Sequence, residues 1–305
     1  MSEKTGQSPW ITQPFAPTWN HYFRPEKVIQ IRSFKALKPS EPIRSMNIMT
    51  VDIGNSRTHW GYFKGKELLD QGNLPSRTAE LDFRPILEKT PNRPIPDGVI
   101  ACSVVPRVSR VLLETARSTG VPVRFLTHER VGALRIQYPR PEEIGPDRLA
   151  NALGGFLHTE APFIVIDMGT AVTLDVVTKK NGYEGGAIAP GFSFLSEYLS
   201  EKTALLPPIN LNKIHRRTGI GRSTTEAMEI GCTKGFSGMI RELVSTCSEE
   251  VISIDGVKPT ILVTGGSFTW VAESWIGRIP FYQHLTLEGL LSRADDLLVE
   301  PEDHS

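Results

Sequence analysis

Short apolar runs rich in β-branched residues alternate with longer amphipathic stretches from Met46 to the end of the chain. The runs read MTVDIG, GVIACSVV, PVRFLT, FIVIDMG and TILVTGG. Runs of this length and composition predict strands. The stretches between them repeat apolar residues at helical spacing. An alternation of strands and helices predicts an α/β protein.

Three stretches predict helices. The first is expected to end at Gly120, since glycine is the common C-cap residue, and its apolar positions are Val108, Val111, Leu112 and Ala116. The second begins with Pro146, which the first helical position tolerates, and its apolar positions are Leu149, Leu153, Phe156 and Leu157. The third begins at Ser223 and Glu226, which have capping-box spacing. Its glycines at 231, 235 and 238 share one helical face, so we expect them to allow close packing against another element.

Residues 1–45 have a different character. They are rich in proline and aromatic residues and show neither helical nor strand periodicity. We expect a poorly ordered extension, or a start codon placed too early with Met46 or Met49 as the true start. A docking arm for a partner is the alternative. We expect two domains in the remainder, at residues 46–150 and 151–300.

An unusual strand–turn–strand pattern occurs twice. Each copy has an apolar strand with an aspartate, a glycine two residues later and a threonine six residues later: Asp52, Gly54 and Thr58 in the first, and Asp167, Gly169 and Thr173 in the second. Identical offsets after two apolar strands indicate an internal duplication, with one copy in each domain.

The residues of these turns suit phosphate binding. Glycine lets the backbone approach a phosphate, and successive N–H groups with Ser, Thr or Asn side chains can donate to its oxygens. The aspartate would repel phosphate, so its expected role is to hold a cation or the waters around it. Asp52 is therefore a candidate for Mg²⁺ binding through water. Two ordinary hairpin turns are the alternative, but the duplication favours a site for a nucleoside triphosphate.

Composition narrows the class of protein. The 34 Lys and Arg residues balance the 34 Asp and Glu residues, so no global positive charge indicates a nucleic acid or an anionic membrane as partner. Three cysteines without CxxC spacing argue against structural zinc and a disulfide framework, and we expect a reducing, cytoplasmic location. No apolar run is long enough to predict a membrane span. Cys102 is expected to be a small core residue.

The motifs of other nucleotide-binding folds are missing. The sequence has no G-x-x-x-x-G-K-[ST] loop and no protein-kinase H-R-D or D-F-G set. The duplicated turns then favour the actin-like ATPase fold, a ribonuclease H-like α/β architecture with two domains around an ATP cleft.

Nine segments resemble one family in kind and order. They are VDIGNSR, ACSVVP, YPRPEEIGPDR, IDMGTAVT, GGAIAPG, KTALLP, IGRSTTEAMEIG, TGG and LTLEGL, between about Met49 and Arg293. Together they resemble the type III pantothenate kinases of the actin-like ATPase superfamily. The resemblance implies ATP-dependent phosphorylation of pantothenate, the first step of coenzyme A biosynthesis. It also implies a cytoplasmic homodimer that needs Mg²⁺ and a monovalent cation, K⁺ or NH₄⁺.

The resemblance also implies site residues. The ATP-binding set is Asp52, Ile53, Gly54, Asn55, Ser56, Arg57, Thr58, His59 and Thr170. The pantothenate-binding set is Tyr138, Gly145, Pro146, Asp147, Arg148 and Thr224. Within these sets Asp147 corresponds to the proton acceptor, and Thr224 to a residue supplied by the neighbouring subunit. Asp167 corresponds to the aspartate of the monovalent cation.

Elementary chemistry is consistent with these roles. A carboxylate in the first turn of a helix can orient an attacking hydroxyl, and the neighbouring Arg148 can pair with a substrate carboxylate. Each residue also has a simpler interpretation. Asp147 could complement the helix dipole, Arg148 could form a surface ion pair, and Thr224 could belong to a helix cap.

The sequence departs from the family pattern at four positions. Pro146 replaces a common alanine, Arg140 a common asparagine, Val172 a frequent threonine and Ser56 a common threonine. None of them removes the expected base or either phosphate loop. Two other functions stay open: a non-catalytic regulator on the same scaffold, like accessory factors to transcription in this family, and a kinase of another small hydroxy acid.

Overall fold

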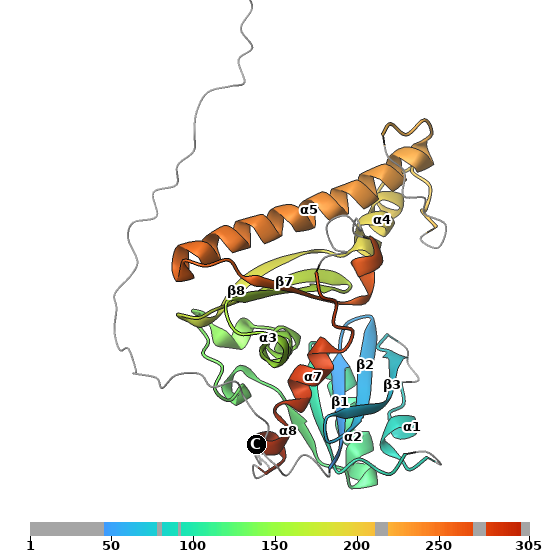
Figure 1. Cartoon of the computed structure of the whole chain (residues 1–305). Helices are drawn as coiled ribbons and strands as arrows, with labels where there is room; N and C mark the ends of the chain where they lie inside the picture. The colour runs from blue at the N-terminus through green and yellow to red at the C-terminus, as the bar shows by residue number, and fades with distance from the viewer. Residues whose placement is uncertain (1–45, 78–80, 91–92, 211–218, 271–278, 300–305) are drawn as a thin grey trace, which may run out of the picture. The chain divides into compact units, whose positions relative to one another are not determined.

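The computed structural model of the 305-residue chain describes residues 46–77, 81–90, 93–210, 219–270 and 279–299, which belong to one compact unit (Figure 1). The N-terminal extension and most of the basic segment LNKIHRRTGIG, including His215, lie outside the described residues. The domain boundary expected near residue 150 stays a prediction.

The first sheet has five strands within the described residues, in the order β3-β2-β1-β4-β5. They are β1 (Asn47–Ile53), β2 (Arg57–Lys64), β3 (Glu67–Pro75), β4 (Gly98–Ser103) and β5 (Val123–Phe125). Strand β1 pairs antiparallel with β2 and parallel with β4. The first strand–turn–strand pattern therefore forms the centre of this sheet.

The second sheet repeats this arrangement, with the order β8-β7-β6-β9 in the described part of the chain. Its strands are β6 (Phe163–Met168), β7 (Ala171–Thr178), β8 (Gly182–Pro190) and β9 (Thr260–Thr264). Strand β6 pairs antiparallel with β7 and parallel with β9. Phe281 forms a parallel bridge to Val263, at the place that β5 occupies in the first sheet. The same strand order and directions confirm the predicted duplication.

Helices occupy matching places in the two halves. They are α1 (Arg84–Leu87), α2 (Pro106–Thr119), α3 (Pro146–His158), α4 (Phe192–Glu201), α5 (Thr224–Asp255), α7 (Leu285–Leu291) and α8 (Ala294–Val299). Short 3₁₀ helices in the described residues are η2 (His128–Arg130), η3 (Pro141–Glu143) and η5 (Gly266–Trp270). Helix α3 follows the first sheet's last strand, and α7 follows Phe281 in the second half. The predicted duplicated α/β fold is confirmed.

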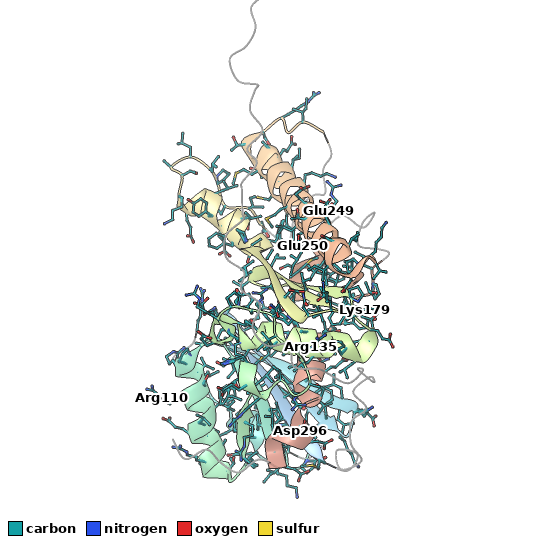
Figure 2. The ribbon with its side chains drawn as sticks, turned by 90° about the vertical axis from the view of Figure 1, so that its left-hand side faces the viewer. Arg110, Arg135, Lys179, Glu249, Glu250 and Asp296 are labelled. Atoms are coloured by element: carbon teal, nitrogen blue, oxygen red, sulfur yellow. The ribbon has the colours of Figure 1, made fainter. Side chains whose placement is uncertain are left out.

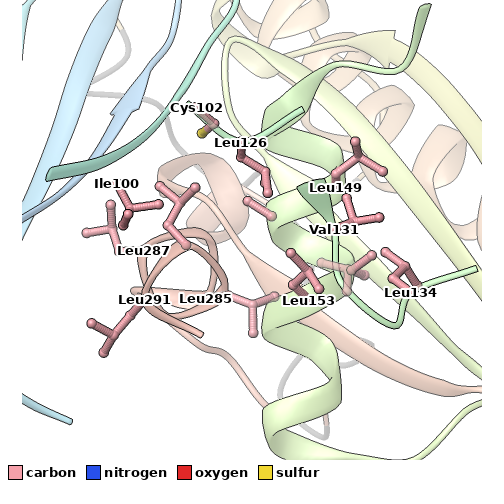
Figure 3. Close-up of a cluster of buried hydrophobic side chains, with 14 of the residues drawn as sticks. Ile100, Cys102, Leu126, Val131, Leu134, Leu149, Leu153, Leu285, Leu287 and Leu291 are labelled. Atoms are coloured by element: carbon pink, nitrogen blue, oxygen red, sulfur yellow. The ribbon is translucent and has the colours of Figure 1, made fainter. Parts of the chain in front are cut away.

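One hydrophobic core joins the two sheets. It contains side chains of β1 and β4 from the first sheet, of β6 and β9 from the second, and of α3 and α7 between them. Figure 3 shows Leu285 of α7 beside α3, with Leu153 on α3, and Leu149 on the side of α3 next to Val131. A second core packs α4 and α5 against the other face of the second sheet, and a third packs α1 and α2 against the other face of the first.

The alternation of side chains along β1 and β6 decides where the two aspartates point. Met49, Val51 and Ile53 pack against α1 and α2, so the opposite face of β1 carries Ile48 and Asp52. In β6, Phe163 and Val165 belong to the core between the sheets, and Asp167 has the same parity. Both aspartates therefore lie on the inner faces, at the ends of the two central strands.

Helices α3 and α7 approach each other closely through glycines. A Cβ atom at Gly289 of α7 would lie 1.9 Å from the carbonyl oxygen of Ala150, and one at Gly154 of α3 would lie 2.3 Å from that of Leu285. No side chain fits at these distances, so two glycines set the contact between these helices.

The helix predictions are confirmed in outline and corrected in detail. Helix α2 ends at Gly120 with a left-handed φ of 73°, as predicted. Leu157 of α3 is 40% exposed, because only the helix before its last turn is enclosed by the two sheets and α7. In α5, Ser223 caps the helix by accepting from the backbone N–H of Glu226 at 3.2 Å.

The expected close packing at the three glycines of α5 is wrong for the described part of the chain. No atom lies within 4 Å of a Cβ position at Gly231, Gly235 or Gly238. The helix instead packs on the second sheet through a neighbouring face that includes Phe236 and Ile240.

Charges of both signs lie on the side of the molecule shown in Figure 2. Arg110 lies on α2 and Arg135 near α3, whereas Glu249 and Glu250 lie on α5 and Asp296 on α8. This mixture fits the balanced composition. Within the described residues, no helix has the length and apolar character needed to cross a membrane.

Candidate active site

The two strand–turn–strand loops meet each other. In the first loop the backbone N–H of Gly54 donates to the carbonyl oxygen of Arg57 at 3.0 Å and closes the turn. The hydroxyl of Thr170, in the second loop, donates to the hydroxyl of Ser56 at 3.2 Å. The two loops, whose contacting residues are 114 positions apart in the sequence, therefore lie against each other, as the phosphate-binding hypothesis requires.

The two loops differ in length by one residue. Asp52 pairs with His59 across the first hairpin, whereas Asp167 pairs with Thr173 across the second. Thr58 therefore points to the outer face, where it is fully buried and its hydroxyl lies 2.9 Å from that of Ser76. The shared offset of six residues does not make the two threonines equivalent, and an ATP contact by Thr58 stays a prediction.

Asp147 lies at the N-terminus of α3. Gly145 is the N-cap residue and Pro146 opens the helix, as predicted. The backbone N–H of Arg148 donates to Oδ1 of Asp147 at 2.9 Å. A Cβ atom at Gly145 would lie 2.4 Å from that oxygen, so glycine leaves room for the carboxylate. The first turn of α3 thus both stabilises the carboxylate and fixes its place.

The electrostatic interaction of Asp147 with the aspartates of both loops shows that the three carboxyl groups lie near one another. The pKa of Asp52 is raised to about 7, chiefly by burial and then by the charges of Asp147 and Asp167. Burial also raises the pKa of Asp167 to about 6, against a hydrogen bond from Asn151, and Asp147 again adds to the rise. The pKa of Asp147 is raised by burial, although the Arg148 N–H opposes this. Three carboxyl groups therefore share one partly desolvated region.

Cys102 and Gly265 support the two loop aspartates. The Cys102 thiol is fully buried and donates to Oδ1 of Asp52 at 3.2 Å. Burial raises the pKa of this thiol well above its ordinary value, so the residue acts as a neutral donor in the core. Gly265 of the TGG segment has a φ of 91°, and a Cβ atom there would lie 2.6 Å from Oδ1 of Asp167. The TGG turn therefore packs against the second loop.

A buried polar network extends from Arg148. Its Nε donates to Oδ1 of Asp175 at 2.7 Å, and its Nη2 donates to the carbonyl oxygen of Leu174 at 3.1 Å. The Tyr183 hydroxyl donates to the same Asp175 oxygen at 3.0 Å. Tyr138 lies against Gly185 of β8, where a Cβ atom would lie 2.9 Å from its ring. Arg148 is thus held in the protein interior and does not form a surface ion pair.

The remaining candidates are less closely connected. Asn55, Arg57 and His59 are exposed. His59 pairs with Asp52 across the hairpin, and its pKa is lowered chiefly by the partial burial of its ring and then by Arg57 and His284. Thr224 is exposed at the start of α5. In the described part of the chain, no hydrogen bond joins Thr224 to the other candidate residues.

Comparison with known proteins identifies the family. The model of the type III pantothenate kinases matches residues 48–246. A type III pantothenate kinase of Akkermansia muciniphila is 39% identical over 247 residues, which cover 80% of this chain and 97% of the relative. One of Methylacidiphilum infernorum is 34% identical over 253 residues, which cover 80% and 86%. The chain belongs to the type III pantothenate kinase family.

A solved structure supports the fold. A conserved Campylobacter jejuni protein assigned to the Baf family of transcriptional activators superposes with a TM-score of 0.52 at 18% identity. The match covers 81% of this chain and 98% of that protein. At this identity the likeness concerns the fold alone.

The four departures from the type III pantothenate kinase pattern leave the contacts described above in place. Val172 is fully buried in the core between the second sheet and α5, so a hydroxyl there would not face the loops. Arg140 is exposed and pairs with Glu143 at 2.8 Å. Pro146 occupies the first position of α3, and Ser56 keeps the hydroxyl that meets Thr170.

The donor set suits hard cations. The charge of Asp147 raises the pKa of both Asp52 and Asp167, and the hydroxyl oxygens of Ser56 and Thr170 lie in the facing loops. Mg²⁺ and K⁺ prefer such oxygen ligands. The described residues contain no ready group of three or more metal-binding side chains, so a bound nucleotide or water would complete the coordination.

Sequence reasoning missed several residues of the site. Asp175 is the one acidic residue of β7 and is fully buried, and Asn151 is four residues after Asp147 on the same face of α3. Asn151 donates to Asp167 at 3.2 Å and accepts from Thr286 of α7 at 2.7 Å. A lone acid in an apolar strand and an amide at helical spacing were the available signals.

Proposed function

We propose that this chain phosphorylates the primary hydroxyl of pantothenate with ATP to give 4′-phosphopantothenate and ADP, the first step of coenzyme A biosynthesis. Membership of the type III pantothenate kinase family supports this reaction. The observation that carries the proposal is the position of Asp147, whose carboxylate is coupled to Asp52 and whose helix begins beside the two facing loops.

The proposed reaction is a direct in-line transfer. The carboxylate of Asp147 accepts the proton of the pantothenate hydroxyl, whose oxygen forms a bond to the γ-phosphorus of ATP. The bond from that phosphorus to the bridging oxygen breaks, and ADP leaves with the electron pair. The raised pKa of Asp147 suits a base that works near neutral pH.

The two loops are proposed to hold the phosphates of ATP. Backbone N–H groups around Gly54 and the hydroxyls of Ser56 and Thr170 are donors that phosphate oxygens accept. Asp52 would hold Mg²⁺ through water, and Asp167 the monovalent cation. When bound, these cations supply positive charge that offsets the charge on the phosphates.

Arg148 is proposed to bind the carboxylate of pantothenate. Within the described residues, its hydrogen bonds involve Nε and Nη2, which leaves Nη1 for a substrate oxygen. Tyr138, beside the same network, would contact the pantothenate chain.

A homodimer is proposed to complete the site with Thr224 of the neighbouring subunit. Thr224 is exposed at the start of α5 and has no hydrogen bond to the site within the described residues. Among the described residues, no atom of another element lies within 4 Å of a Cβ position at Gly231, Gly235 or Gly238 of α5. Large exposed side chains lie nearby on α4, where Phe194 and Tyr198 are both 52% exposed. A second copy of the chain would account for these three features.

Product analysis tests the reaction. Purified protein, ATP, Mg²⁺ and pantothenate are incubated with K⁺, NH₄⁺ or Na⁺, and the products are identified by mass spectrometry. We expect 4′-phosphopantothenate, with more product in K⁺ or NH₄⁺ than in Na⁺. No product from folded protein with any cation would favour the regulatory alternative. Preference for another hydroxy acid would favour the third function, although neither Arg140 nor Val172 faces the described site.

A further inference from the structure

Asp175 is the point at which four hydrogen-bond donors converge. Its Oδ1 accepts from Nε of Arg148 and from the Tyr183 hydroxyl, at 2.7 and 3.0 Å. Its Oδ2 accepts from the hydroxyl of Thr173 and Nδ2 of Asn151, at 3.3 and 3.5 Å. Because this carboxylate accepts hydrogen bonds on both oxygens, an amide N–H₂ group in place of either oxygen would face donors.

This carboxylate is completely buried, and the arginine that it pairs with is 8% exposed. Separating the two side chains would leave an uncompensated charge in the interior, which is strongly unfavourable. The ion pair therefore holds both side chains in place. The guanidinium is held on one edge by Asp175 and Leu174, and its carbon lies 5.9 Å from the centre of the Tyr183 ring. Arg148 therefore has one defined orientation before a substrate arrives.

We infer that Asp175 is a positioning residue that orients Arg148 toward the anionic end of the substrate. The inference rests on the proposed function, because it gives Arg148 the substrate carboxylate as its partner. A bidentate or directed bond to a carboxylate requires the guanidinium plane to be fixed. Asp175 supplies this constraint from β7 without touching the substrate, and Tyr183 and Thr173 hold Asp175 in turn.

The Asp175→Asn substitution tests this role, since it keeps the shape of the side chain. Its amide N–H₂ group would face the donors of Asn151 and Thr173, or those of Arg148 and Tyr183, so that the four hydrogen bonds cannot all form. We expect Arg148 to lose its fixed orientation. The affinity for a carboxylate should then fall, whereas contacts with uncharged parts of the substrate should be retained.

The experiment compares pantothenate with its primary carboxamide, which lacks the negative charge. Dissociation constants of both are measured by calorimetry for wild type and Asp175→Asn in the presence of a non-hydrolysable ATP analogue. Wild type is expected to prefer pantothenate, and the substitution to reduce that preference about tenfold or more. The KM for ATP should change less than the affinity for pantothenate, since within the described residues no hydrogen bond joins Asp175 to Ser56 or Thr170.

A matched control is Thr178→Val in the same strand. Thr178 is also buried, and its hydroxyl donates to Glu184 at 2.8 Å. It is the last residue of β7 and pairs with Gly182, whereas Asp175 pairs with Gly186. This variant loses the bond to Glu184 and the one that the Thr178 hydroxyl accepts from the backbone N–H of Asn181, but it does not touch Arg148, so its preference for the carboxylate should match that of wild type. Circular dichroism and melting temperature show whether each variant is folded.

The possible outcomes separate the inference from the proposed function. An unchanged or increased preference for pantothenate in folded Asp175→Asn overturns the inference, whereas wild-type turnover with pantothenate keeps the function. An equal loss of affinity for both ligands indicates a structural role only and also overturns it. A wild type that shows no preference for the carboxylate overturns the inference and the role proposed for Arg148, whereas the proposed reaction fails only if pantothenate is not phosphorylated. If Asp175→Asn does not fold, Tyr183→Phe removes one of the four donors and is expected to reduce the preference by a smaller factor.

Discussion

At the scale of single residues, the site consists of carboxylates that are far apart in the sequence. The alternation of side chains along the strands brings two of them to one region. Asp52 and Asp167 face inward because the alternate residues of β1 and β6 fill the outer cores. Asp147 reaches the same region from the start of α3. Repulsion between the carboxylates disfavours their ionised forms. Bound cations would offset this repulsion, so we expect cations in this region.

The raised pKa values predict how stability depends on pH. The folded-state pKa of Asp52 is about 7, above the ordinary value of 3.8, so the folded state binds this proton more tightly than the unfolded state. Its contribution to stability is complete below about pH 4 and is lost as the pH rises through 7. Asp167, with a pKa of about 6, acts in the same direction.

Thermal melting of Asp52→Asn checks this sign. Without nucleotide, the variant should have a higher melting temperature than wild type at pH 8, and the difference should shrink at pH 5. Added Mg²⁺ should raise the melting temperature of wild type at pH 8 more than that of the variant. A variant that is less stable than wild type at pH 8 would show that the Asp52 carboxylate is stabilised by contacts and not strained by burial.

At the scale of elements, the sequence predicted the two strand–turn–strand patterns, α2, and the start of α3, because each has a local signal. Gly120, Pro146 and the alternating apolar runs act within a few residues of their own position. The burial of α3 on nearly all sides had no such signal, since it depends on both sheets and on α7. The glycines that matter for packing are Gly154 and Gly289, and not those of α5.

Gly289→Ala tests the contact between α3 and α7. The added Cβ atom would lie 1.9 Å from the carbonyl oxygen of Ala150, so the helices must move apart. We expect a loss of roughly 1–3 kcal/mol in the free energy of unfolding, measured by urea denaturation. Gly266→Ala is the control, because no atom lies within 4 Å of its Cβ position, and its change should stay within about 0.5 kcal/mol. Equal stability of the two variants would contradict the packing described for α7.

At the scale of the whole molecule, the duplication explains why one chain has two facing loops. The same strand order surrounds β1 and β6, and the equivalent helices α3 and α7 pack together between the sheets. The repeated motif was sufficient to predict this fold. It could not reveal the one-residue difference between the loops, because the register of each hairpin is set by pairing across the sheet. The partners of Arg148 were hidden for a similar reason, since Asp175 and Tyr183 meet it only in three dimensions.

The proposed shared site makes a prediction about mixed dimers. Asp147→Asn and Thr224→Ala should each be nearly inactive alone. Co-expressed with different affinity tags and purified through both tags, they should give mixed dimers in which one of the two sites has both native residues, so roughly half of the wild-type activity is restored. ADP release by the co-purified mixture measures this recovery. Purified mixed dimers with no more activity than the separate variants would show that Thr224 acts within its own subunit or not at all.

The proposed mechanism depends on Asp147 as the base. Pantothenate-dependent ADP release by wild type and Asp147→Asn tests this role most directly. The substitution keeps the hydrogen bond from the backbone N–H of Arg148 but removes the proton acceptor. We predict a fall in kcat of about 10²- to 10⁴-fold, with the affinity for ATP nearly unchanged. A folded Asp147→Asn protein that releases ADP at the wild-type rate would contradict the mechanism.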